Sequence, residues 1–222
     1  MTTPLHSFFR RVRCGKPIVV VSGLPRSGTS MMMRMLESGG LEVVSDNIRE
    51  QDEDNPRGYF ELERVKDLDK GGDKSWLGEA RGKAIKVISS LLKDLPGEFD
   101  YKIIFMRRHL DEVLASQERM LERRSETNKT SDEAMKASYQ KHLKDVAFFF
   151  RYRKNFDVLD IQYDKVIQDP AGHAREVNDF LGGRLDVSAM AAAVEKRLYR
   201  NRKAPGQADA AAAPNTSEAS GE

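Results

Sequence analysis

The 222-residue sequence has little of several features that would each indicate a particular class of protein. It contains a single cysteine, Cys14, which excludes an internal disulfide and a cysteine-rich metal site and suits a reducing compartment, so a cytoplasmic location is expected. No apolar run approaches the ~20 residues that a membrane-spanning helix needs. The net charge of +2, with basic and acidic residues interleaved, gives no reason to expect nucleic-acid binding.

The composition that remains is that of an ordinary globular domain. Apolar residues make up 39% and charged residues 32% of the chain, enough for one α/β domain with a sizeable core. We expect an N-terminal arm over residues 1–16 and the domain over residues 17–202. Residues 203–222 are rich in Ala and Pro with almost no bulky side chain, so we expect a disordered tail there.

One stretch, Ile18 to Leu36, organises the domain. Its β-branched run Ile18 to Val21 predicts a buried strand, Ser22 to Gly28 predicts a turn-rich loop, and an apolar helix follows to about Glu37. The spacing G-x-x-x-x-G is that of a phosphate-binding loop, in which backbone N–H groups and the helix N-terminus attract an anion. A nucleotide triphosphatase would have Lys where this chain has Thr29, and the nearest cation is Arg26.

Strand and helix patterns alternate through the rest of the domain. Further strands are predicted at 41–44, 84–88, 101–106 and 156–161, and helical segments at 61–70, 75–81, 111–124, 132–153, 170–181 and 186–193. This alternation predicts a doubly wound α/β domain, with a central parallel sheet of about five strands flanked by helices. His142 lies on or beside the apolar stripe of the long fourth helix of this series, so we interpret it as a core histidine.

Cations stand at the ends of two predicted strands. Lys86 interrupts an apolar strand, and Arg107 and Arg108 follow another, where parallel strands place their ligands. Each of these cations could instead have no part in ligand binding. Lys86 on an edge strand would merely extend to solvent, and the two arginines would pair with the acidic loop after residue 44. A site built from Arg26, Lys86 and Arg108 needs no metal and suits the transfer of a sulfuryl group, which carries one negative charge.

Two motifs carry a family resemblance. The segment P-R-S-G-T-S at 25–30 resembles the 5′-phosphosulfate loop of sulfotransferases that use 3′-phosphoadenosine 5′-phosphosulfate (PAPS), especially protein-tyrosine sulfotransferases and many bacterial ones. Arg108 and Ser116, eight residues apart, resemble the family's 3′-phosphate pair. DEDNPRGYFE and YDKVIQDPAGHAREVNDFLG are also similar to segments of bacterial sulfotransferases, so the resemblance covers about residues 17–185.

The resemblance implies a role for each matching residue. Arg108 and Ser116 would hold the 3′-phosphate, Lys86 would act at the sulfuryl group, and no metal would take part. The acceptor would be a hydroxyl or amine of a small molecule, carbohydrate or peptide. The 5′-phosphosulfate would be held by Pro25, Arg26, Ser27, Gly28, Thr29 and Ser30, of which Arg26 would also be catalytic.

Three departures from the family pattern matter. Ile88 stands where many cytosolic members have a catalytic histidine, so we look to Asp46 or Glu61 for the base. The C-terminal R-K-G-x-x-G motif is absent, and Arg200 is the candidate to replace it at the 3′-phosphate. The chain is short, which leaves an acceptor site that is open or completed by a partner; a homodimer is one arrangement. The alternative functions are a P-loop nucleotide or small-molecule kinase and a non-catalytic nucleotide-binding protein.

Overall fold

A four-stranded parallel sheet forms the centre of the computed structural model, which describes residues 15–46, 60–123 and 130–195. Its strands are β1 (Ile18–Gly23), β2 (Ala84–Lys86), β3 (Tyr101–Arg107) and β4 (Phe156–Gln162), in the order β2-β1-β3-β4. Val20 of β1 pairs with Ile85 on one side and with Ile103 on the other. All four strands run the same way, so their carboxyl ends share one edge of the sheet, as the alternating pattern predicts.

The expected strand at 41–44 is reduced to a single bridge. Val43 pairs in parallel with Ala84 of β2, and the backbone of residue 84 exchanges hydrogen bonds with Glu42 and Val44. β2 is three residues long, so this ladder cannot extend further. The described part of the sheet therefore has four strands, against the five or so that the sequence suggests.

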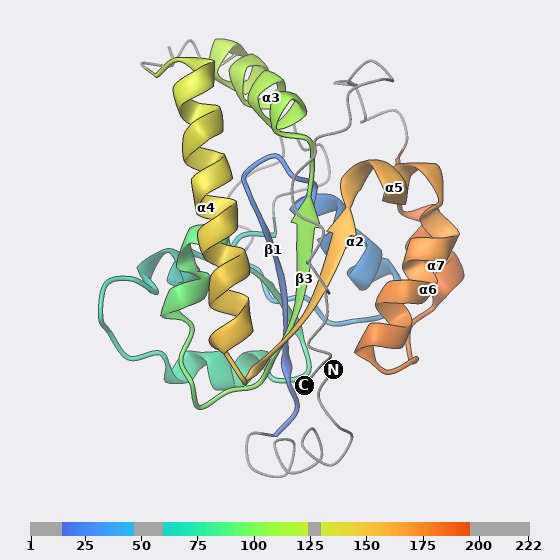
Figure 1. The fold of residues 1–222 in the computed structure, drawn as a ribbon. Coiled ribbons are helices and arrows are strands. Elements are labelled where there is room, and N and C mark those ends of the chain that lie inside the picture. Colours follow the sequence, from blue (N-terminus) through green and yellow to red (C-terminus); the bar gives the residue numbers. More distant parts are fainter. Residues whose placement is uncertain (1–14, 47–59, 124–129, 196–222) are drawn as a thin grey trace, which may run out of the picture.

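Each face of the sheet is covered by its own layer (Figure 1). One face carries α4 (Asp132–Tyr152) and three short 3₁₀ helices, η1 (Glu63–Asp67), η2 (Ser75–Ala80) and η3 (Ser89–Asp94). The other carries α2 (Thr29–Ser38), α5 (Tyr163–Gln168), α6 (Pro170–Leu181) and α7 (Val187–Ala192). The strands alternate accordingly: Ile103 and Phe105 pack under the first layer, and Ile104 and Met106 under the second.

α3 (Leu110–Arg123) follows β3 at the carboxyl edge of the sheet, shown at the top of Figure 1. The helices predicted at 111–124, 132–153, 170–181 and 186–193 are confirmed to within one or two residues. The short helices α5 and η3 are additions that the sequence pattern did not indicate. Within the described ranges, no helix is both long and apolar enough to cross a membrane. The expected arm up to residue 14 and the expected tail lie outside those ranges.

Candidate functional site

The loop between β1 and α2 forms the centre of the candidate site. Arg26 adopts a positive φ of 67°, and the side chain of Ser27 is buried with no hydrogen-bond partner for its Oγ. Gly28 is the N-cap of α2, and no side chain caps this helix end. The first N–H groups of a helix have no partner within the helix, so those of α2 can donate to a ligand bound at the loop. The loop therefore offers backbone donors and a buried hydroxyl to an anion.

Gly28 is required by a close approach of Tyr163. A Cβ atom at position 28 would lie 2.3 Å from the Tyr163 ring, and φ there is 99°. Tyr163 is the first residue of α5 and directly follows β4, so the carboxyl end of β4 fixes the position of this ring beside the loop. Burial raises the pKa of Tyr163 above its ordinary value, although the nearby positive charge of Arg108 opposes the shift. The phenol therefore stays protonated at neutral pH.

Arg108 joins α3 to the loop. Its Nη1 donates to the carbonyl oxygen of Arg26 at 3.0 Å, and its Nε donates to Glu112 Oε2 at 3.0 Å. The guanidinium carbon also stands 4.6 Å from the centre of the Tyr163 ring. The side chains of Arg108 and Glu112 are only 8% and 4% exposed. A guanidinium held by a carboxylate, a carbonyl and a ring face has a fixed orientation.

The loop reaches back to α3 through Arg26. Arg26 Nε donates to Ser116 Oγ at 3.0 Å, and Ser116 is buried on the second turn of α3. Arg26 from one predicted motif is thus brought together with Arg108 and Ser116 from the other. This contact spans 90 residues of sequence.

Lys86 approaches the other side of the loop. β2 is one of the two edge strands of the sheet, a position from which Lys86 could extend to solvent. Instead its side chain is 12% exposed, and its Nζ lies 3.4 Å from Ser30 Oγ and 3.9 Å from Glu61 Oε1. The ammonium is therefore directed at the start of α2, flanked by a hydroxyl and a carboxylate.

The two candidate bases occupy different positions. Glu61 is the carboxylate beside Lys86. Asp46 accepts a hydrogen bond from the backbone N–H of Glu63 at 2.5 Å through its Oδ2, and its own N–H donates to the Glu61 carbonyl at 3.1 Å. The Asp46 carboxylate thus binds the first residue of η1, whereas that of Glu61 lies beside the cation.

The neighbouring arginine has a different environment. Arg107 pairs with Asp160 of β4 through its Nε at 2.5 Å, on the side of β3 away from β1. Arg107 forms an ion pair with Asp160, and Arg108 forms one with Glu112. Neither carboxylate belongs to the acidic segment after residue 44. Residues 47–59 of that segment lie outside the described ranges, as does Arg200.

Two residues of this cluster were missed by sequence reasoning. Glu112 lies four residues after Arg108, the i,i+4 spacing at which opposite charges meet on a helix. That spacing could have indicated the ion pair. Tyr163 begins the quoted segment YDKVIQDP, but nothing in its neighbours along the chain indicates contact with a loop 135 positions earlier, at Gly28.

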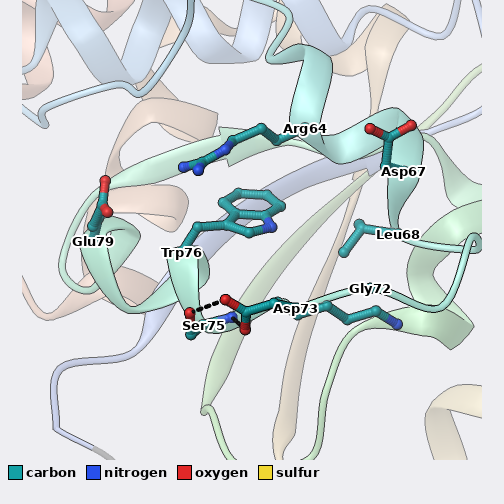
Figure 2. Close-up of a pocket in the computed structure, with 9 residues that line it drawn as sticks. Arg64, Asp67, Leu68, Gly72, Asp73, Ser75, Trp76 and Glu79 are labelled. Carbon is teal, nitrogen blue, oxygen red and sulfur yellow. Dashed lines mark hydrogen bonds between the residues drawn. The ribbon is translucent and has the colours of Figure 1, made fainter.

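A cavity of about 430 Å³ lies away from this cluster, between η1 and the segment leading into η2. In Figure 2 the Trp76 ring stands in its centre, with Arg64 above it and Leu68 beside it. Asp73 accepts hydrogen bonds from the Ser75 backbone and hydroxyl. The lining contains both cations and carboxylates, so it favours neither an anionic nor a cationic ligand. None of the predicted site residues belongs to it. The lining residues are Arg64, Asp67, Leu68, Gly72, Asp73, Lys74, Ser75, Trp76 and Glu79.

Comparison with known proteins gives two positive findings. The structure is similar to a solved "Sulfotransferase Domain from the Curacin Biosynthetic Pathway", with a TM-score of 0.50 and 12% sequence identity, over 86% of this chain and 93% of that one. At this identity the likeness shows the fold. No curated protein sequence matches. The model of the sulfotransferase family matches residues 73–186, which include Lys86, Arg108, Ser116 and Tyr163 and make up just over half of the chain, so the protein belongs to the sulfotransferase family.

Proposed function

We propose that the protein transfers the sulfuryl group of PAPS to a hydroxyl or amine of an acceptor, without a metal ion. The observation that carries the proposal is the placement of a cation on each side of one loop. Arg108 contacts the Arg26 carbonyl on the side of α3, and Lys86 approaches Ser30 on the side of β2. A donor with phosphate groups at both ends of its ribose needs two such anion sites joined by a phosphate-binding loop.

The loop holds the 5′-phosphosulfate. The N–H groups at the start of α2 and the hydroxyls of Ser27, Thr29 and Ser30 bind its oxygens, and the helix dipole adds a favourable field. The buried Ser27 Oγ without a partner is the kind of group that such a ligand satisfies. Pro25 leads into the positive φ of Arg26 and belongs to the turn that shapes this cradle.

The 3′-phosphate is bound by Arg108 and Ser116. Arg108 directly follows β3 and Ser116 lies on α3, and both already contact Arg26. Arg200 remains a proposed additional contact to this phosphate.

Lys86, Arg26 and Glu61 act in the transfer step. The acceptor oxygen or nitrogen bonds to sulfur as the bond from sulfur to the 5′-phosphate oxygen breaks, and 3′-phosphoadenosine 5′-phosphate (PAP) leaves with that electron pair. Lys86 and Arg26 stabilise the negative charge that develops on the sulfuryl and leaving oxygens. Glu61 accepts the proton of the acceptor, because its carboxylate lies beside the ammonium of Lys86. Asp46, engaged at the start of η1, positions this segment instead.

Calorimetric titration distinguishes this function from the alternatives. The purified chain is titrated with PAP in the presence of EDTA and, separately, with ATP and Mg²⁺. We expect PAP to bind in EDTA and Mg-ATP to bind far more weakly. Binding of Mg-ATP alone would instead identify a kinase. PAP binding with no sulfate transfer to any member of a broad acceptor panel would identify a non-catalytic nucleotide-binding protein.

A further inference from the structure

Ile88 is a large apolar residue exposed at the edge of the candidate site. Among the described residues, the large exposed hydrophobics are Ile88, Phe148 and Tyr152. Phe148 and Tyr152 contact each other along α4, with tilted rings whose centres are 4.7 Å apart. Ile88 is 46% exposed and stands two residues after Lys86, where the chain leaves β2.

Strand geometry places Ile88 on the same side as Lys86. Ile85 and Val87 are buried in the core under the α4 layer. The backbone stays extended past β2, since the Val87 N–H donates to Val21 O at 3.0 Å and Ile88 has φ −65° and ψ 147°. Successive side chains of an extended segment alternate, so Lys86 and Ile88 are both directed away from that core, toward the loop side.

The structure holds Ile88 in place from its following residues. Its carbonyl accepts from the Leu91 N–H at 3.0 Å as the N-cap of η3. Ser89 is buried, and its Oγ lies 2.8 Å from His142 Nε2 on α4. The exposed side chain therefore stands on a backbone fixed at Val87 and at Ser89, and is not part of a fraying segment.

Single apolar side chains are common on protein surfaces and need no partner. Ile88 is different because of its position beside Lys86. An acceptor whose nucleophile reaches the sulfuryl group at Lys86 lies against Ile88, the next side chain on the same face. A sugar hydroxyl has further hydroxyls on the adjacent carbons, and these would lose water against an isoleucine without gaining a hydrogen bond. An aryl or alkyl carbon skeleton instead gains by covering it.

We propose that Ile88 determines acceptor specificity, and that the acceptor is a phenol or alcohol whose carbon skeleton beside the reacting hydroxyl is apolar. This inference rests on the proposed sulfuryl transfer from PAPS. It selects one class among the small molecules, carbohydrates and peptides that the sequence leaves open.

The test measures acceptor binding to the PAP complex, which needs no turnover. The chain saturated with PAP is titrated calorimetrically with 2-naphthol and with methyl β-D-glucopyranoside. We expect the naphthol to bind at least tenfold more tightly than the glucoside. Ile88→Ser should weaken naphthol binding about tenfold, the loss expected for one partly covered aliphatic side chain, with PAP affinity unchanged. Phe148→Ser removes an exposed aromatic side chain on α4 and should change neither affinity.

The outcomes separate the two proposals. No binding of PAP to the wild-type chain would overturn the proposed function and this inference with it. Normal PAP binding with equal or tighter binding of the glucoside, or with no naphthol binding at all, would overturn the acceptor class alone. Naphthol binding that Ile88→Ser leaves unchanged, or that Phe148→Ser weakens equally, would overturn the role of Ile88.

Discussion

Arg26 Nε donates to Ser116 Oγ at 3.0 Å, while the Arg26 carbonyl accepts from Arg108 Nη1 at 3.0 Å. The loop after β1 and the segment after β3 thus hold each other through two crossed bonds. Arg26, which is proposed to act at the sulfuryl group, therefore contacts both Arg108 and Ser116, which are proposed to bind the 3′-phosphate. Replacing Arg108 or Ser116 should therefore affect ligands with a 3′-phosphate most.

Ser116→Ala tests the smaller of these two contributions. One hydroxyl that donates to a phosphate is worth about 1.5 kcal/mol, the low end of the range for hydrogen bonds to charged groups, so PAP affinity should fall by roughly that amount. Adenosine 5′-phosphosulfate, which lacks the 3′-phosphate, should lose much less. Calorimetry with both ligands measures the difference. Ser131→Ala, which removes the N-cap of α4, is the control that should alter stability and not ligand affinity.

Arg108→Ala should reduce PAP affinity by about 1.5–3 kcal/mol, the scale of a hydrogen bond to a charged group, with a much smaller effect on adenosine 5′-phosphosulfate. Arg107→Ala is the matched control, because the adjacent arginine pairs with Asp160. Equal losses for the two ligands would contradict the assignment of Arg108 to the 3′-phosphate.

Loss of Arg108 also leaves the Glu112 carboxylate buried beside an empty position, which lowers the stability of the fold. The double variant Arg108→Ala with Glu112→Gln removes that charge, so it keeps the binding measurement interpretable. We expect it to regain stability without regaining PAP affinity.

The fold was predictable where a pattern is long enough to show its period. The 21-residue helix α4 and the apolar runs of β1 and β3 could be located from the sequence. α5, a single six-residue segment, has no room for a helical repeat and was missed. The strand expected at 41–44 has the right composition, but its partner β2 is too short to extend the pairing.

The candidate site could be predicted where a motif ties a residue to a strand end, as for the positions of Arg26, Lys86, Arg108 and Ser116 around one loop. The roles of these residues stay predictions. The site was not predictable where a role depends on a neighbour from another part of the chain. Whether Asp46 or Glu61 faces Lys86 depends on how the segment after residue 60 returns to β2, and no local pattern describes that path. The contact of Tyr163 with Gly28 is of the same kind.

Gly28→Ala tests that contact through stability. The new methyl group would lie 2.3 Å from the Tyr163 ring, in a backbone conformation with φ 99°. Gly40→Ala is a matched control, since Gly40 has φ 90° and nothing within 4 Å of the added carbon. Both variants should lose about 1–2 kcal/mol of unfolding free energy to the left-handed backbone. Only Gly28→Ala should lose about 1–3 kcal/mol more to the clash, as measured by urea denaturation. Equal losses would mean that the ring moves aside freely.

His142 should make stability depend on pH in the mildly acidic range. Burial lowers its pKa below the ordinary value of 6.5, with the Asp145 charge opposing the shift. Between the lowered pKa of the folded state and 6.5, the unfolded chain binds more protons than the folded one. The contribution of His142 is therefore fully present above pH 6.5 and is lost as the pH falls toward the folded-state pKa. Urea midpoints measured at pH 7.5 and at pH 5.5 should consequently differ less for His142→Gln than for the wild-type chain. An equal or larger difference in the variant would show that protonation of His142 does not oppose folding, and that the imidazole beside Ser89 is charged in the folded state.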